Sequence, residues 1–121
     1  MSTLSTHVLD TMHGVPALGM RVTLTGPHGL AVQGVTNEDV RVPDLLGGGL
    51  APADLAPGRY RLTFGVAEYF RSKGVALPDP PFLEDVAIDF GMAAPDPSKG
   101  SGHYHVPLLV SPFSYSTYRG S

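Results

Sequence analysis

The sequence contains no cysteine. Its absence excludes disulfide scaffolds, thiolate metal sites and cysteine nucleophiles, so the stability of the fold must come from packing. A long apolar run is also missing, and the segment 1–7, MSTLSTH, has neither the basic nor the apolar part of a signal peptide. We therefore expect a soluble, cytoplasmic protein with no membrane partner.

Basic charge is scarce in this chain. There are 8 Lys and Arg against 11 Asp and Glu, which gives a formal net charge of −3. No basic stripe is present of the kind that follows a phosphate backbone. Nucleic acid is therefore a poor candidate partner.

The residues that are present suit one all-β domain spanning residues 1–121. With 42% hydrophobic residues the chain can form a single core, and 15 glycines and 12 prolines imply many turns. Strand-like segments separated by turn signals are typical of a sandwich or barrel, and eight such segments suit two sheets of four strands. The predicted strands are 4–10, 20–25, 30–35, 40–42, 59–66, 83–90, 103–110 and 113–119.

One short helix and several turns are also predicted. The segment 67–73, AEYFRSK, has helical character and is stopped by Gly74, a residue that favours the left-handed conformation after a helix. Two helical turns are not stable alone, so this helix needs a sheet beneath it. The tripeptide Gly14-Val15-Pro16 is one of the predicted turns.

Three of the five histidines, His7, His103 and His105, fall on predicted strands. Because side chains two apart on a strand share a face, His7 lies on the face of Ser5, and His103 lies on the face of His105. Taken alone, each histidine is most simply a surface or hydrogen-bonded core residue. The H-x-H pair is also half of a metal site, but the sequence offers no obvious third ligand, and we expect no metal.

The longest motif is the segment 103–121, HYHVPLLVSPFSYSTYRGS, which resembles the C-terminal signature of 5-hydroxyisourate hydrolases in the transthyretin-like protein family. Other segments agree in order and spacing. They are LSTHVLD at 4–10 with GVPA at 14–17, Thr36-Asn37 leading to Arg41, and RYRLTF at 59–64 followed by EYF at 68–70. The resemblance therefore covers the whole chain.

The resemblance implies a transthyretin-like (prealbumin-like) β-sandwich of two four-stranded sheets with one short helix. It also implies a homotetramer with active sites at the mouths of a central channel. The reaction would be hydrolysis of 5-hydroxyisourate to 2-oxo-4-hydroxy-4-carboxy-5-ureidoimidazoline, a step of purine metabolism in urate degradation towards allantoin, without a cofactor.

By position, the resemblance implies four catalytic residues, His7, Arg41, His105 and Ser121. The same four residues together with Tyr118 would bind the substrate, whereas His103 is not one of the set. Val40 stands where the family usually has glycine before the arginine.

These residue types suit the opening of a cyclic amide. The reaction needs an activated water, help for the oxyanion and a proton for the departing nitrogen. Histidine serves the first and last tasks, although the sequence does not assign the base to His7 or to His105. Arg41 would orient the substrate and stabilise charge through its planar fork, and Ser121 would position the water or a histidine tautomer. No G-x-S-x-G elbow indicates a serine nucleophile.

The alternative function is a transthyretin-type carrier of small ligands without catalysis. The two proteins would share a fold, so individual residues must distinguish them. The carrier is similar but has lysine at the position of His7, lacks the imidazole of His105 and continues past the position of Ser121. A bulky Tyr118 would also narrow the channel. These differences favour the hydrolase.

Overall fold

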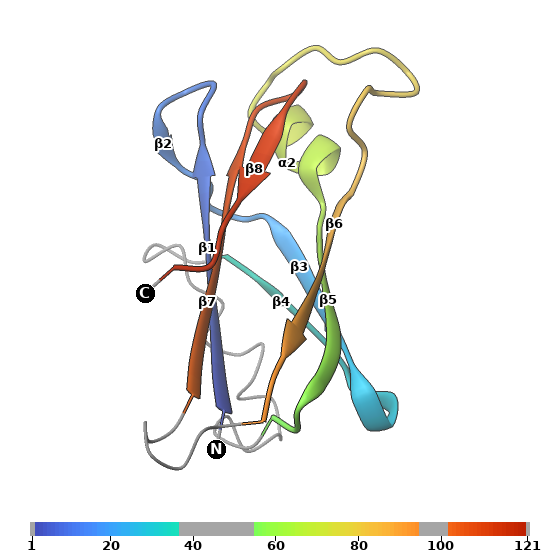
Figure 1. Ribbon diagram of the computed structural model, residues 1–121. Coiled ribbons are helices and arrows are strands. Elements are labelled where there is room, and N and C mark those ends of the chain that lie inside the picture. The colour runs from blue at the N-terminus through green and yellow to red at the C-terminus, as the bar shows by residue number, and fades with distance from the viewer. Residues whose placement is uncertain (1, 37–54, 95–101, 121) are drawn as a thin grey trace.

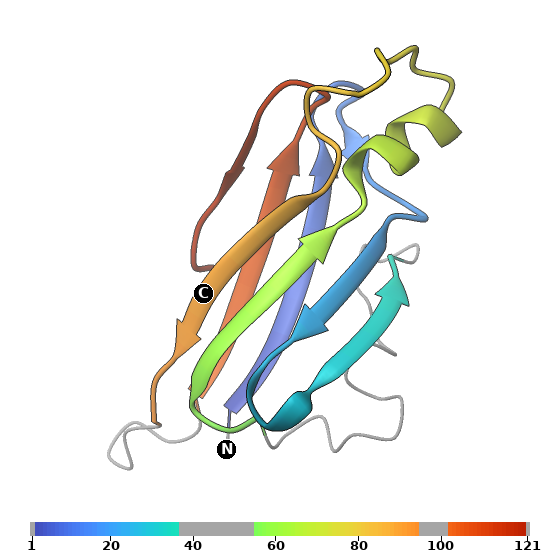
Figure 2. The ribbon, with the colours of Figure 1, turned by 90° about the vertical axis from the view of Figure 1, so that its right-hand side faces the viewer.

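The computed structural model describes residues 2–36, 55–94 and 102–120, and in these ranges it forms two facing β-sheets (Figures 1 and 2). One sheet has the strand order β2-β1-β7-β8 and the other β4-β3-β5-β6. The predicted sandwich of two four-stranded sheets is therefore confirmed. The strands are β1 (Ser2–Asp10), β2 (Val15–Pro16), β3 (Arg21–Thr25), β4 (Ala31–Val35), β5 (Gly58–Phe64), β6 (Val86–Met92), β7 (Gly102–Val110) and β8 (Tyr115–Thr117).

The centre of the first sheet is a parallel pair made by the first and the seventh strands. Strand β1 pairs with β7 along its whole length, from Ser2 opposite Gly102 to Asp10 opposite Val110. The flanking strands β2 and β8 run antiparallel to their neighbours, as do the strands of the second sheet. Residues about a hundred positions apart in sequence therefore lie side by side.

The core lies between the two sheets and follows the alternation expected of strands. On β1, Leu4, Thr6 and Val8 are buried, whereas His7 between them is exposed. In the opposite sheet, Leu62 and Phe64 of β5 are fully buried in the same core. The faces predicted for β1 are thus confirmed, and burial of the inner face directs His7 outward.

A single α-helix in the described residues, α2 (Val66–Ser72), covers one end of the sandwich, and a short 3₁₀ turn, η1 (Pro27–Gly29), precedes β4. Helix α2 begins one residue before the predicted segment and buries Val66, Tyr69 and Phe70 against the core. Gly74 follows it with φ +81°, in the left-handed region that its prediction required. Packing against the sandwich therefore stabilises this short helix, as expected.

One strand prediction and one turn prediction need correction. The predicted strand 113–119 shortens to Tyr115–Thr117 because a turn occupies 111–114, where the backbone N–H of Ser111 donates to the carbonyl of Ser114. Val15 and Pro16, predicted as a turn, form the edge strand β2, where proline is tolerated. The predicted strand 40–42 lies outside the described residues.

A buried carboxylate joins the end of β1 to α2. Asp10 has no exposed side-chain surface and accepts hydrogen bonds from the backbone N–H of His13 (2.9 Å), from His13 Nδ1 (2.6 Å) and from the hydroxyl of Tyr69 (2.9 Å). Burial disfavours the charged form, but the hydrogen bonds outweigh it and lower the pKa of Asp10. Burial, together with the Asp10 carboxylate, raises the pKa of Tyr69.

We predict that Tyr69→Phe lowers the free energy of unfolding at neutral pH by about 1.5–3 kcal/mol, the usual value for a hydrogen bond to a charged group. Because the pKa of Asp10 is lowered in the folded state, this stability is present above the unfolded carboxyl pKa of about 3.9 and is lost as pH falls through the folded pKa. Urea unfolding should therefore show a difference between the two proteins that shrinks in acid.

Tyr60→Phe is the matched control, because the hydroxyl of Tyr60 donates to the neutral carbonyl of Ala56. Its effect on stability should stay constant over the same acidic range. An equally constant effect of Tyr69→Phe would contradict the charged hydrogen bond to Asp10.

Candidate active site

Two of the predicted catalytic residues, His7 and His105, meet on the outer face of the sheet β2-β1-β7-β8. Their ring centroids are 6.3 Å apart and their ring planes are nearly perpendicular, at 88°. His7 comes from β1 and is exposed, whereas His105 comes from β7 and is half-buried. The parallel register, with Ser5 opposite His105 and His7 opposite Pro107, places both imidazoles on this face.

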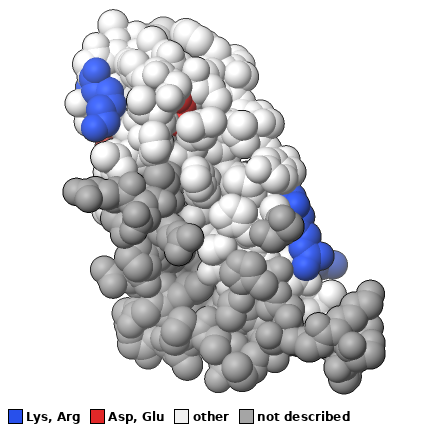
Figure 3. Space-filling view, turned by 90° about the vertical axis from the view of Figure 1, so that its left-hand side faces the viewer, with Lys and Arg blue, Asp and Glu red and all other residues white. Residues whose placement is uncertain are grey.

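Apolar side chains follow the histidine pair along its two strands. Few charged atoms lie on this side of the molecule in the part that the structure describes (Figure 3). Leu9 and Leu109, which follow on the same face, are half-buried, and Pro107 is buried.

His105 is held on two sides of its ring. Ser5 Oγ lies 2.8 Å from His105 Nδ1, and the backbone N–H of Gly120 donates to the carbonyl of His105 at 2.7 Å. Gly120 approaches the ring so closely that a Cβ placed there would lie 2.5 Å from His105 Cδ2. The segment after β8 returns alongside β7 in Figure 1. Gly120 is thus fixed against the histidine, and a larger residue would have to displace the imidazole.

Arg119, the residue before Gly120, also contacts β7. The Arg119 guanidinium lies 4.1 Å from the centroid of the Tyr104 ring, in the geometry of a cation–π interaction. The Tyr104 hydroxyl accepts a hydrogen bond from the backbone N–H of Ala93. The Tyr118 side chain is 60% exposed.

The structure thus describes three of the five predicted site residues, His7, His105 and Tyr118. Arg41 and Ser121 lie outside the described residues, as does Val40. Sequence reasoning placed Ser5 on the face of His7 but missed its contact with His105. That contact depends on the parallel pairing of β1 with β7, which no local sequence pattern indicates.

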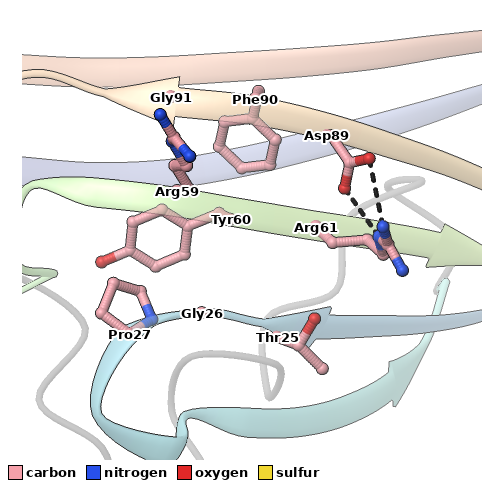
Figure 4. Close-up of a pocket in the computed structure, with 9 residues that line it drawn as sticks. All are labelled: Thr25, Gly26, Pro27, Arg59, Tyr60, Arg61, Asp89, Phe90 and Gly91. Carbon is pink, nitrogen blue, oxygen red and sulfur yellow. Dashed lines mark hydrogen bonds and ion pairs between the residues drawn. The ribbon is translucent and has the colours of Figure 1, made fainter.

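A different hollow, of about 920 Å³, lies over the other sheet (Figure 4). Arg61 projects there but is paired with Asp89 through contacts of 2.6 and 3.2 Å, and the guanidinium lowers the pKa of Asp89. Tyr60 and Phe90 stack beside them. The lining of this hollow has no histidine, and its carboxylate, Asp89, is already paired with Arg61, so the hollow is a weaker candidate for acid–base chemistry than the histidine pair. It is lined by Thr25, Gly26, Pro27, Arg59, Tyr60, Arg61, Asp89, Phe90 and Gly91.

A smaller hollow, of about 410 Å³, lies between the β1–β2 turn and α2. Its histidine, His13, is already bonded to Asp10. Within the described ranges, no three His, Cys, Asp or Glu side chains are grouped to hold a metal ion. In the same ranges, no helix is both long and apolar enough to cross a membrane.

Known proteins resemble the chain over its full length. The family described as "HIUase/Transthyretin family" matches residues 4–120. A 5-hydroxyisourate hydrolase of Pseudomonas aeruginosa is 45% identical, with 100% of this chain and 93% of that protein covered. The structure of the Klebsiella pneumoniae 5-hydroxyisourate hydrolase has a TM-score of 0.77 and 36% identity, with both chains covered fully.

A transthyretin structure from Sparus aurata is also similar, with a TM-score of 0.75, 27% identity, and coverage of 97% of this chain and 95% of that one. The sequence matches and the structural matches thus indicate the same family, and both agree with the two-sheet sandwich described above. The chain therefore belongs to the HIUase/Transthyretin family.

Proposed function

We propose that the chain is an enzyme, a 5-hydroxyisourate hydrolase that opens the cyclic amide of its substrate to give 2-oxo-4-hydroxy-4-carboxy-5-ureidoimidazoline. The observation that carries the proposal is the meeting of His7 and His105 on one face, 6.3 Å apart between ring centroids. The full-length similarity to proteins named 5-hydroxyisourate hydrolase supplies the substrate. The reaction belongs to urate degradation in purine metabolism.

The chemistry assigned to the pair is proton transfer. A water oxygen bonds to the amide carbonyl carbon as a histidine takes its proton, and the carbon–nitrogen bond breaks as the departing nitrogen receives one. We propose that Arg41 holds the substrate and the developing oxyanion through its planar fork, and that Ser121 positions the water or a histidine. Tyr118 would contact the substrate. No metal or cofactor is assigned a role.

We further propose a homotetramer of single-domain chains acting in the cytoplasm. Exposed aromatic side chains around β8 support self-association, because Phe113, Tyr115 and Tyr118 are 65%, 47% and 60% exposed. The family match over residues 4–120 supports one domain. Light scattering combined with size-exclusion chromatography would measure the mass of the assembly.

A carrier function is the second candidate, because the fold is also that of a transthyretin. Fold alone does not distinguish the two functions. The imidazole pair favours hydrolysis. The deciding experiment follows the ultraviolet absorbance of freshly generated 5-hydroxyisourate with and without the protein. Decay no faster than the spontaneous rate would exclude the hydrolase.

Replacement of each histidine in turn tests their roles. We expect His7→Ala and His105→Ala each to lower kcat by roughly 10²-fold or more, the usual loss for a general acid–base group. His103→Ala is the control, because His103 lies two residues from His105 on the same strand and is given no role. Steady-state kinetics on the three folded variants measures this. Equal losses at all three positions, together with inhibition by a chelator, would indicate a metal or structural role.

Arg41→Lys tests whether charge alone is sufficient at that position. We expect a clear loss of kcat/KM, because one ammonium group does not reproduce the paired hydrogen bonds of a guanidinium. The measurement is the same absorbance assay over a range of substrate concentrations. Full activity with lysine would show that only a positive charge is needed.

Extension of the chain after Ser121 tests the role of the tail. Because Gly120 is bonded to the His105 carbonyl, added residues would crowd the histidines and displace Ser121. We expect a C-terminal tag to lower activity far more than the same tag before Met1. Removal of Ser121 should also lower activity while changing the melting temperature by only about a degree or two, since terminal residues make few core contacts. Full activity of the tagged and the shortened proteins would remove Ser121 from the site.

A further inference from the structure

Ser5 occupies a position from which it controls the ring of His105. Its Oγ lies 2.8 Å from His105 Nδ1, and the two residues are direct partners in the β1–β7 ladder. Both side chains are half-buried. The backbone register therefore brings the two side chains within hydrogen-bonding reach of each other.

The hydrogen-bond partner of one imidazole nitrogen determines whether the other nitrogen can exchange a proton. When Nδ1 carries a proton that it donates, Nε2 is left with a lone pair in the neutral ring and with a proton in the charged ring. Nε2 is then the nitrogen that exchanges protons, whether His105 acts as the base or as the acid. A hydroxyl oxygen accepts such a hydrogen bond, as a carboxylate does, but it carries no charge.

The same molecule contains the charged version of this contact. His13 Nδ1 lies 2.6 Å from the buried Asp10 carboxylate. His7 on β1 faces His105 with ring centroids 6.3 Å apart, and Gly120 lies against the His105 ring. His103 lies on the strand of His105, and Ser121 follows Gly120.

We propose that Ser5 is a positioning residue for His105. Its hydroxyl, 2.8 Å from Nδ1, engages that nitrogen and holds the ring in one orientation, so that Nε2 is the nitrogen that exchanges protons in the reaction. Gly120 closes the opposite side of the ring, at Cγ and Cδ2. This inference rests on the proposed hydrolase function, because it assigns Ser5 a task in that reaction.

The direct test compares Ser5→Ala with Ser5→Thr. We expect Ser5→Ala to lower kcat by about tenfold, the size of one lost hydrogen bond, with little change of KM. Threonine keeps the hydroxyl, so Ser5→Thr should stay within about threefold of the parent. Ser5→Asp should move the acidic limb of the pH–kcat profile to higher pH, because a carboxylate at Nδ1 stabilises the imidazolium form.

Thr6→Val is the matched control. Thr6 also bridges β1 and β7, since its hydroxyl donates to the carbonyl of Val106 at 2.7 Å, but it does so on the core face. Loss of that bridge should leave kcat and its pH profile unchanged. An equal loss of kcat in Thr6→Val and Ser5→Ala would mean that looser strand pairing is the cause, and would overturn the proposal.

A spectroscopic measurement separates this inference from the proposed function. The ¹⁵N chemical shifts of His105 report which ring nitrogen is protonated, whether or not the protein is active. We expect both ring shifts of His105 to change in Ser5→Ala but not in Thr6→Val. Unchanged shifts and unchanged kcat in Ser5→Ala would overturn the role of Ser5. Failure of the parent to hydrolyse 5-hydroxyisourate would instead overturn the proposed function.

Discussion

The parallel pairing of β1 with β7 is the interaction on which both the core and the candidate site depend. It runs from Ser2 opposite Gly102 to Asp10 opposite Val110, and it is reinforced on the core face by the hydrogen bond from Thr6 to Val106. A slip of one residue would exchange the two faces of a strand. Val8 or Leu108 would then turn to the outside and a histidine would turn into the core. The same register therefore fixes packing and chemistry together.

Packing and chemistry are divided between the two faces of this pair. Inward residues such as Val8 and Leu108 are fully buried, so they hold the strands without contributing polar groups. Outward positions are free of that packing constraint and carry Ser5, His7 and His105. Reactive side chains placed on rigid central strands keep their separation better than side chains on loops would. The core thus gives the imidazole pair its geometry.

The sequence predicts local structure here better than it predicts pairing. Alternating residues give the faces of β1 and β7, and Gly74 marks the end of α2, because these signals are local. The prediction of a turn at Val15–Pro16 was wrong. These residues form a strand because they pair with Leu9 and Asp10, and their own composition does not indicate it. His7 and His105 were found through resemblance to a family. The contact of Ser5 with His105 could not be found, because it needs the register of two strands a hundred residues apart.

Two of the described histidines are bonded through Nδ1, but they lie in different parts of the fold. His13 is paired with a buried carboxylate that also binds Tyr69, so its hydrogen bonds join a turn to a helix and stabilise the fold. His105 is paired with a hydroxyl on the outer face and lies beside a second imidazole. Both imidazoles are therefore held at Nδ1, one by a group that belongs to the core and the other by a group on the face of the candidate site. For this reason a fold shared with a transthyretin can support catalysis through changes at a few outward positions, while the inward positions continue to serve the core.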